Sequence, residues 1–412
     1  MAFTYNHTRK ACYLAYICQA VINNLAPLLF IIFQDSDGLS YEKLGGLILL
    51  NFLTQLVVDI VAARYADKIG YRTAMVAAHI LCAAGFLLLS AAPLMPVSMF
   101  AGLGIGVVTF GIGGGLLEVL VSPIIDSLPA PSEQKAAGMS LLHSFYCWGQ
   151  VAVVAITTVL LALMGNRSWQ IIPLIWMLLP IINLFLFLKV PLAPQEHDKI
   201  TGVGRLFRMP VFWAAMAVMV CAGASEQTIS QWSSLFAEQG LGLSKVWGDL
   251  AGPCMFAVLM GLGRTFYGIF GAKIRLIPFI GVSAVLCVAS YLITALSGIP
   301  VISLVGCALC GLSVSIMWPG AFSLSAARFP MGGTAMFGIL AMCGDLGCAS
   351  GPWLAGIVAD ATTGSGFFAS INNFLFGGDA LGLKMGILVG TLFPVIMLCC
   401  LPVLGKNPGG DI

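Results

Sequence analysis

Charged residues are scarce in this sequence. Only 9% of the 412 residues are Asp, Glu, Lys or Arg, whereas 59% are hydrophobic, and the mean hydropathy is +0.99. A water-soluble chain of this length could not bury so much apolar surface, so soluble multidomain architectures are excluded. The formal net charge is only +2 and the basic residues form no cluster, which argues against a nucleic-acid partner.

Patterns that bind metals or form disulfides are also scarce. Most of the 13 cysteines lie inside apolar runs, where a thiol packs as a small hydrophobic group. Cys399 and Cys400 are adjacent, and Cys307 and Cys310 lie in an apolar run without histidine. We therefore expect no disulfide, no metal site and no cofactor. No nucleophile and base lie on facing spans, so the sequence does not indicate an enzyme.

Long apolar runs, in contrast, are abundant. A membrane-spanning helix needs roughly 20 apolar residues, and twelve such runs are separated by charged or turn-rich segments. We predict an all-α polytopic membrane protein with six transmembrane helices in residues 1–190, a cytoplasmic linker at 191–208, and six more helices in residues 209–412. The predicted spans are 11–33, 43–65, 73–92, 96–122, 137–164, 169–189, 211–236, 246–271, 276–297, 300–327, 334–359 and 382–404.

The distribution of Lys and Arg predicts the orientation of these helices. If both termini are cytoplasmic, the loops and tails on that side hold every Lys and Arg except Lys43, Arg167, Lys245 and Lys384. Helical membrane proteins carry such an excess of basic residues in their cytoplasmic loops. We expect a monomeric protein of the plasma (cell inner) membrane, embedded in the lipid bilayer. The sequence predicts no role for the outer connection at 362–381.

Three acidic residues lie inside predicted spans: Glu118, Glu226 and Asp345. A charge at the bilayer centre costs about 2.5–3.5 kcal/mol even on the most lenient insertion scale. Burial favours the neutral form of a carboxyl and water favours the ionised form, so a carboxyl that alternates between them can carry a proton. We assign proton coupling first to Glu226, then to Glu118 and Asp345; a protonated acid bonded to a neighbouring helix is the alternative. For Asp59, an ion pair with Arg64 is the ordinary explanation.

Polar and aromatic side chains within the spans predict a solute site. Glu226, Ser230 and Ser233 share one helical face, and that face is too polar for lipid. Amides, hydroxyls and aromatic rings together suit a small hydroxylated or zwitterionic solute. A structural role is the alternative for His143 and for the Trp residues. The predicted solute contacts are Gln19, Asn23, Asn24, Glu118, His143, Tyr146, Gln150, Glu226, Gln227, Ser230, Gln231, Trp232 and Trp318.

Two corresponding loops carry basic turns that contain glycine: RYADKIGYR at 64–72 and GRTFYGIFGAK at 263–273. The first resembles the loop signature of the major facilitator superfamily, G-x-x-x-D-R/K-x-G-R-R/K, with Ala63 in place of the leading glycine. This resemblance implies two pseudo-symmetric six-helix bundles around a midplane site. It also implies a conformational latch, in which Asp67 would face the N-terminal end of the eleventh helix. The residues assigned to the latch are Asp67, Lys68, Arg72 and Arg264; charges that only solubilise the loop and set orientation are the alternative.

The fourth span resembles the L-fucose:proton symporter branch of that superfamily. The branch has a Gly-rich segment, then a glutamate and an Asn-Pro pair. At the corresponding positions this sequence has glycines at 113–115, then Glu118 and Ser122-Pro123. Asn23-Asn24 also matches, but the acidic residue that the branch carries three positions further on is Pro27 in this sequence. The resemblance implies that Glu118 is functional. Because the second family acid is missing, we expect another buried acid to bind the proton, and we do not infer fucose as the solute.

These features together predict a secondary active transporter. A small polar solute and a proton would enter a midplane cavity, the two halves would rock, and both would be released on the other side. The alternative is a proton-coupled antiporter that exports a drug or a metabolite, because the residues do not encode the direction of transport.

Overall fold

Helices make up all the regular structure in the residues that the computed structural model describes, which are 3–129, 132–193, 206–270, 275–329, 333–363 and 381–405. A helix lies at each of the twelve predicted spans, as the all-α prediction requires. Most of the predicted linker at 191–208 and of the outer connection at 362–381 falls outside the described residues.

We define the N-terminal half as the helices that precede the predicted linker. Its first span is divided into two helices because Pro27 lacks an N–H group and the chain turns at Leu29. The helices are α1 (Tyr5–Leu28), α2 (Phe30–Asp37), α3 (Tyr41–Ile69), α4 (Tyr71–Ala91), α5 (Met99–Ser127), α6 (Ser132–Met164) and α7 (Ile171–Lys189).

The C-terminal half follows the linker. A π-helical segment at Leu250–Cys254, which contains Pro253, joins two helices of its second span. The helices are α9 (Pro210–Leu235), α10 (Lys245–Asp249), α11 (Met255–Phe270), α12 (Leu276–Leu296), α13 (Pro300–Val314), α14 (Met317–Arg328), α15 (Gly333–Thr363), α17 (Leu381–Val389) and α18 (Leu392–Gly405).

Two helices, α9 and α15, differ from the others in composition. Ten helical segments of the described chain are long and apolar enough to cross a membrane, and these two are not among them. Both carry buried polar groups, including Glu226 on α9 and Asp345 on α15. They pack against each other, so neighbouring helices rather than lipid surround much of their polar surface.

Glycines permit close helix contacts in both halves. A β-carbon at Gly106 or Gly113 on α5 would collide with the backbone of α4. Between α9 and α15, a β-carbon at Gly223 would collide with the carbonyl oxygen of Gly344, and one at Gly347 with the backbone of α9. Small residues are needed wherever helix backbones approach this closely.

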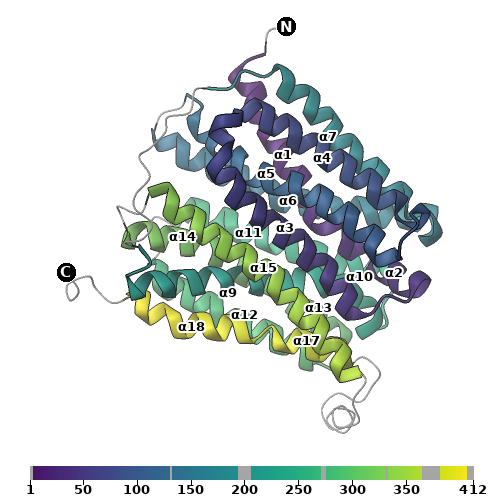
Figure 1. Cartoon of the computed structure of the whole chain (residues 1–412). Coiled ribbons are helices and arrows are strands. Elements are labelled where there is room, and N and C mark those ends of the chain that lie inside the picture. The colour runs from purple at the N-terminus through teal and green to yellow at the C-terminus, as the bar shows by residue number, and fades with distance from the viewer. Residues whose placement is uncertain are drawn as a thin grey trace.

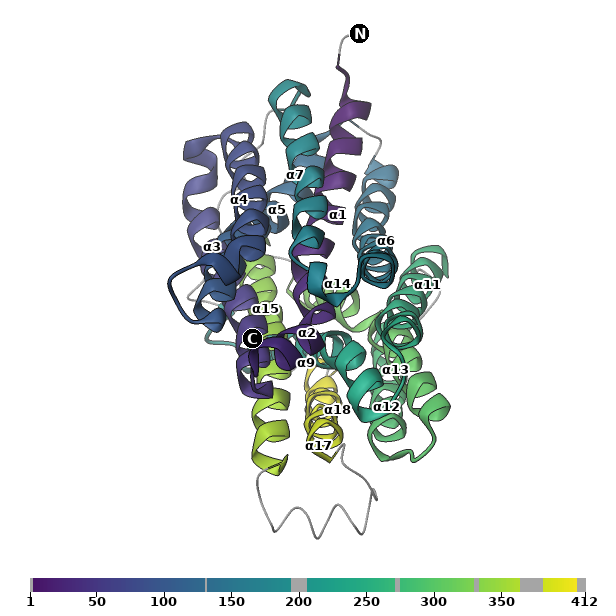
Figure 2. The same cartoon turned by 90° about the vertical axis from the view of Figure 1, so that its right-hand side faces the viewer.

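Among the described residues, the two halves meet where α3 packs against α15, α6 against α10 and α11, and α1 against α9. Figures 1 and 2 show α3 and α15 side by side. In Figure 1, helices of both halves converge where α2 and α10 lie, and we call this the closed end. The opposite end, where α1 begins and α18 finishes, is the terminus end.

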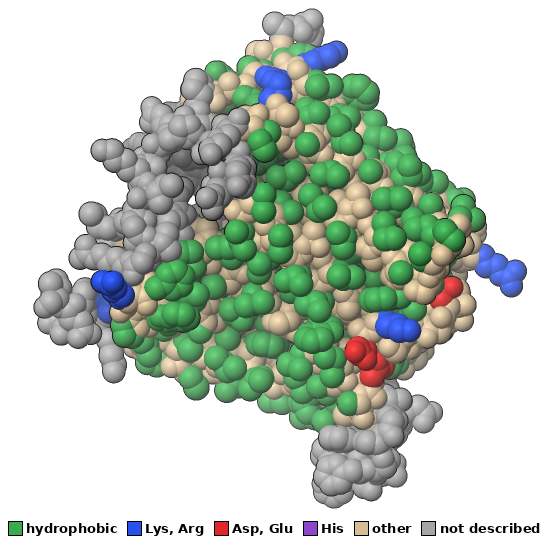
Figure 3. Space-filling view, viewed as in Figure 1, with side chains coloured by type: hydrophobic (Ala, Val, Ile, Leu, Met, Phe, Trp, Pro, Cys, Tyr) green, Lys and Arg blue, Asp and Glu red, His purple; other side chains and the backbone are tan. Residues whose placement is uncertain are grey.

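The outer surface of the bundle is apolar. On the face shown in Figure 3, hydrophobic side chains cover most of the area and charged side chains lie near the edges. Large residues such as Val57, Phe185 and Val282 are more than half exposed on α3, α7 and α12. An exposed apolar surface of this extent is stable when lipid covers it.

Candidate functional site

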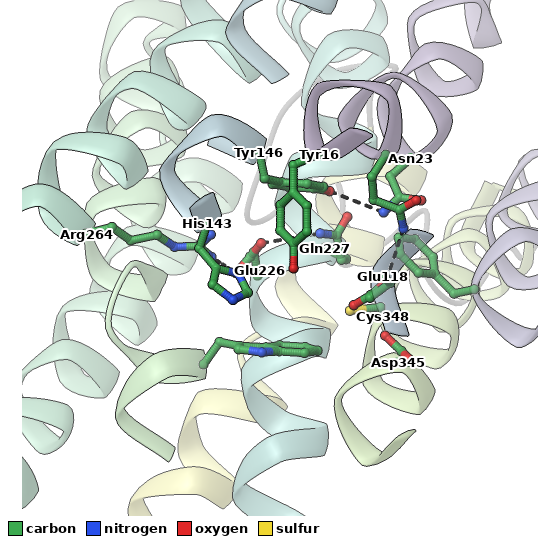
Figure 4. Close-up of a pocket in the computed structure, with 13 residues that line it drawn as sticks. Tyr16, Asn23, Glu118, His143, Tyr146, Glu226, Gln227, Arg264, Asp345 and Cys348 are labelled. Carbon is green, nitrogen blue, oxygen red and sulfur yellow. Dashed lines mark hydrogen bonds and ion pairs between the residues drawn. The ribbon is translucent and has the colours of Figure 1, made fainter. Parts of the chain in front are cut away.

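A cavity of about 90 Å³ lies between the two halves, near the middle of the helices (Figure 4). Both halves contribute to its wall, which consists of Tyr16, Gln19, Asn23, Phe52, Glu118, His143, Tyr146, Glu226, Gln227, Arg264, Trp318, Asp345 and Cys348.

Helical spacing explains how α1 contributes to the wall. Tyr16, Gln19 and Asn23 are three and four residues apart, so they point to one face of the helix. Gln19 Nε2 donates a hydrogen bond to Glu118 Oε2 on α5 at 3.0 Å. The hydroxyls of Tyr16 and Ser122 lie 3.1 Å apart and join the same two helices. The carboxyl of Glu118 is therefore held against α1.

An arginine from α11 holds Glu226 of α9. Arg264 Nη2 lies 3.0 Å from Glu226 Oε2, and Arg264 Nη1 lies 3.4 Å from Cys147 Sγ on α6. The ion pair offsets part of the cost of burying the two charges. Arg264 Nε is buried and has no hydrogen-bond partner among the described residues.

Amide side chains form a network beside the cavity. Gln55 Nε2 donates to Asn23 Oδ1 at 2.8 Å and to Asn51 Oδ1 at 3.0 Å. Asn51 Nδ2 also donates to Asn23 Oδ1, at 3.0 Å, and Gln19 Nε2 donates to Gln55 Oε1 at 2.6 Å. The positions 51, 55 and 59 on α3 are four residues apart and form one polar stripe. The network fixes the orientation of the two cavity amides on α1.

Asp345 of α15 lines the same cavity and is 2% exposed. Another buried acid, Asp59, lies on α3, the helix of the other half that packs against α15. Figure 4 shows Arg264 and Glu226 on one side of Tyr16, with Glu118 and Asp345 on the other side. The acidic groups of the cavity are thus divided between an ion-paired side and a side that no arginine reaches within the described residues.

Hydrogen bonds join the halves one helical turn beyond the cavity, toward the closed end. Gln150 Nε2 on α6 donates to Ser230 Oγ on α9 at 2.8 Å. Gln231 Nε2 donates to the carbonyl oxygen of Asn23 at 3.0 Å. That carbonyl would ordinarily accept a bond from the residue four positions later, but Pro27 has no N–H group to donate. The proline in α1 therefore creates an acceptor for the other half.

A second set of contacts lies at the closed end itself. The Asp360 carboxylate accepts hydrogen bonds from the backbone N–H groups of Tyr41 and Glu42 at 3.1 and 2.6 Å. These two residues begin α3, and a carboxylate at a helix N-terminus is stabilised by free N–H groups and by the helix dipole. The Tyr41 hydroxyl donates to Gln239 at 2.8 Å, and Gln239 Nε2 donates to Gln34 at 2.6 Å. All four bonds cross between the halves.

The structure brings together most, but not all, of the predicted solute contacts. Gln19, Asn23, Glu118, His143, Tyr146, Glu226, Gln227 and Trp318 line the cavity. Asn24, Gln150, Ser230, Gln231 and Trp232 do not.

These remaining residues make other contacts. Asn24 Nδ2 donates to the carbonyl oxygen of Ala20 at 2.8 Å. Trp232 is 1% exposed, its Nε1 donates to the carbonyl oxygen of Pro352 at 2.9 Å, and its ring lies 5.7 Å from that of Phe30. In this conformation Trp232 belongs to the packing between the cavity and the closed end.

Four cavity residues were assigned from the sequence neither to solute binding nor to proton coupling: Tyr16, Phe52, Arg264 and Cys348. Tyr16 lies on the same helical face as the two cavity amides of α1, so periodicity could have identified it. Asp59 also lay in a recognisable stripe, at the four-residue spacing of α3. No local pattern could place Arg264 beside an acid on another helix.

The predicted latch is described only in part. The side chains of Asp67 and Lys68 lie outside the described residues. Arg72 donates to two carbonyl oxygens at the end of α7, both at 2.7 Å, and so joins α4 to α7. Arg264, which the sequence placed in the latch, instead lines the central cavity, because its side chain pairs with Glu226.

Comparisons with known proteins agree on the fold. The family model described as Major Facilitator Superfamily matches residues 12–352. An inward-facing, occupied structure of a bacterial homolog of the human lysosomal transporter Spinster has a TM-score of 0.77 and 14% identity, covering 98% of this chain and 99% of that one. The E. coli fucose:proton symporter FucP, in its outward conformation, has a TM-score of 0.67 and 17% identity, covering 97% and 99%.

A D-xylose-proton symporter has a TM-score of 0.74 and 15% identity, and the match covers 95% of each chain. A comparison with curated proteins gives no match. At these identities, the solved structures establish a shared fold and nothing about the solute.

Proposed function

Since this chain belongs to the major facilitator superfamily, and so is an integral membrane transporter rather than an enzyme, we propose that it moves a small polar solute together with a proton by alternating access. The solute is sugar-like or another hydroxylated or zwitterionic metabolite. We place the protein in the plasma membrane with both termini in the cytoplasm, and we keep the division into bundles at 1–190 and 209–412 as part of the proposal.

The observation that carries the proposal is the ion pair between Glu226 and Arg264 in a cavity that both halves line. A proton that binds the Glu226 carboxylate removes its negative charge and weakens the pair. The guanidinium of Arg264 then has several donors free for an acceptor group of the solute. The proton and the solute therefore favour each other's binding, which is the condition for symport.

The contacts at the closed end support alternating access. With cytoplasmic termini, the closed end faces the outside, so the described conformation is closed toward the outside. To admit a solute from there, α3 must separate from Asp360, and Gln239 must separate from Gln34 and Tyr41. We propose that the Asp67 loop forms its latch with the start of α15 when the terminus end closes.

The wall of the cavity supports a polar solute. Amides of Gln19, Asn23 and Gln227 offer both donors and acceptors, and the hydroxyls of Tyr16 and Tyr146 do the same. The ring of Trp318 offers an apolar face to the less polar side of a solute. Gln19 Oε1 and Arg264 Nε have no hydrogen-bond partner among the described residues, and a purely apolar substrate would leave both unpaired, at a cost of about 1–3 kcal/mol each.

Proteoliposomes with an imposed pH gradient test the proposal. A panel of sugars, amino acids and organic anions is first ranked by the thermal stabilisation of the detergent-solubilised protein. Solutes that stabilise it are then tested for uptake. Uptake that increases when the outside is acidified supports symport, and a membrane potential of 100 mV per proton supports roughly 50-fold accumulation. Solute export driven by inward proton flow would show the antiporter instead, and the absence of any proton-dependent flux would contradict both.

A further inference from the structure

We propose that the solute is a zwitterionic amino acid whose ammonium group binds to Glu118 and Asp345 and whose carboxylate binds to Arg264. The inference rests on the proposed function and narrows its solute, from a hydroxylated or zwitterionic metabolite to one that carries both charges. It gives Glu118 and Asp345 a role in solute recognition, whereas the sequence favours proton coupling for them.

One side of the cavity offers unpaired hydrogen-bond acceptors. Glu118 and Asp345 line the cavity on the same side of Tyr16 (Figure 4), and Gln19 also lines it. Asp345 is 2% exposed and Gln19 is 3% exposed. Neither Asp345 Oδ2 nor Gln19 Oε1 has a hydrogen-bond partner among the described residues. A buried acceptor without a donor is costly, so these atoms favour a solute group that donates.

Hydrogen bonds fix the orientation of the Gln19 amide. Gln19 Nε2 donates to Gln55 Oε1 at 2.6 Å and to Glu118 Oε2 at 3.0 Å. Gln55 presents its oxygen to Gln19 because its own Nε2 donates to Asn23 Oδ1 and Asn51 Oδ1. Both N–H groups of the Gln19 amide are therefore used, and a flip of this amide would break two bonds. Gln19 thus offers its oxygen, an acceptor, to a third group.

The charges of the cavity wall favour an ammonium group as the donor. Among the described residues that line the cavity, Arg264 is the only Lys or Arg, and it is paired with Glu226 on the other side of Tyr16. A buried carboxylate is stable only with a partner of opposite charge or with a proton. A hydroxyl of a neutral sugar could donate a hydrogen bond but would bring no charge. An ammonium group brings a positive charge and three N–H donors.

The other side of the cavity suits the carboxylate of the same solute. Arg264 Nε is buried and has no partner in the part of the chain that the structure describes. When a proton neutralises Glu226, as in the proposed mechanism, the guanidinium can bind a carboxylate through two parallel hydrogen bonds. Figure 4 shows His143 on this side as well, where its imidazole can donate to the same carboxylate.

Binding to the detergent-solubilised, full-length protein tests the inference. The probes are α- and ω-amino acids, each compared with its N-acetyl derivative, which keeps the carboxylate but has no ammonium group, and with neutral sugars. At acidic and at neutral pH, we expect at least one amino acid to raise the Tm and its N-acetyl derivative to bind roughly tenfold more weakly. The inference is wrong if no amino acid stabilises the protein, or if the N-acetyl derivative binds equally well.

Two variants locate the ammonium group. Glu118→Gln and Asp345→Asn remove a charge with little change in shape, and each should reduce the preference for the amino acid over its N-acetyl derivative by roughly tenfold. A variant that only disturbs the fold would weaken both ligands alike. Asp249→Asn is the matched control, because Asp249 is also buried but is ion-paired with Lys245 at 3.2 Å and does not line this cavity. An unchanged preference in both cavity variants would overturn the proposal.

Transport measurements separate this inference from the proposed function. If a neutral sugar is accumulated with protons and no amino acid binds, the symport proposal stands and the zwitterionic solute is refuted. If an amino acid binds with the expected preference but shows no proton-dependent flux, symport is refuted and the assignment of the solute stands.

Discussion

The guanidinium of Arg264 lies 3.0 Å from the carboxylate of Glu226, although the two residues are 38 positions apart and on different helices. Around this pair, both halves supply amides and aromatic rings, and the N-terminal half also supplies the hydroxyls of Tyr16 and Tyr146. The guanidinium donor Arg264 Nε has no partner in the part of the chain that the structure describes. In the proposed mechanism, a proton and a solute act on the charge of this pair.

The ion pair predicts that removing Arg264 alone lowers stability more than removing both partners does. Arg264→Gln leaves Glu226 buried without its partner, and removing one member of a buried pair costs about 3–5 kcal/mol. We expect the loss of folding stability to be about 3 kcal/mol or less, because the Arg264 side chain is 17% exposed. In thermal unfolding, we expect Arg264→Gln to lower the Tm and the double variant with Glu226→Gln to recover part of it. A double variant less stable than Arg264→Gln would contradict this account of the pair.

The cap at the closed end predicts a change in conformational equilibrium. Asp360→Asn weakens two charge-assisted bonds to the start of α3, which favours opening of that end by about 1–2 kcal/mol, or roughly tenfold. An impermeant thiol reagent applied at the closed end should then modify Cys348 in the cavity faster, as measured by mass spectrometry. Glu42→Gln is the control, because its side chain is exposed beside the same helix start. Equal rates in the two variants would show that Asp360 does not hold this end shut.

Substitutions of Trp232 and Trp318 should have different effects. Trp232→Phe removes the N–H bond to Pro352, so we expect a stability loss of about 1 kcal/mol and an unchanged KM for the solute. Trp318→Phe alters the cavity wall, so we expect a higher KM and little change in Tm. Uptake kinetics and thermal unfolding of the same samples provide both readouts. If Trp232→Phe raised the KM while Trp318→Phe did not, Trp232 rather than Trp318 would be the residue that contacts the solute.

Helix packing predicts opposite outcomes at two glycines. Gly347→Ala would place a methyl group against the carbonyl oxygen of Val220 on α9, and such overpacking typically costs about 1–3 kcal/mol. Gly281→Ala on α12 meets no atom within 4 Å and should stabilise the helix by about 0.5–1 kcal/mol. The Tm of each variant checks this pair, and a stable Gly347→Ala protein would mean that α9 and α15 are less closely packed.

The fold could be predicted from the sequence because the bilayer imposes a length and a polarity on every span. Ten of the helical segments follow from apolar runs of about 20 residues, whereas α9 and α15, at two further predicted spans, carry buried polar groups. The sequence indicates that Pro27 bends its span or frees a carbonyl, but it does not predict that the span divides into two helices at Leu29, since proline also occurs within continuous transmembrane helices. Gln231 could not be predicted as the donor to the carbonyl that Pro27 leaves free, because the donor depends on which helix of the other half lies opposite.

The site could be predicted only where residues share one helix face. The acids Glu118, Glu226 and Asp345 were identified because a charged residue in an apolar run is costly, and all three line one cavity. Partners on other helices could not be predicted, because contacts between spans depend on helix rotation and packing. For this reason Arg264 was placed in a loop latch.

The most direct test of the account compares two transport modes in Glu226→Gln. Glutamine keeps the shape of the side chain but cannot gain or lose a proton, so solute exchange between equal pools should persist while proton-driven accumulation disappears. The measurement is counterflow and pH-driven uptake of the same solute in the same proteoliposomes. Loss of accumulation with retained exchange is the predicted result. Wild-type accumulation in the variant would contradict the role of Glu226 and, with it, the central claim.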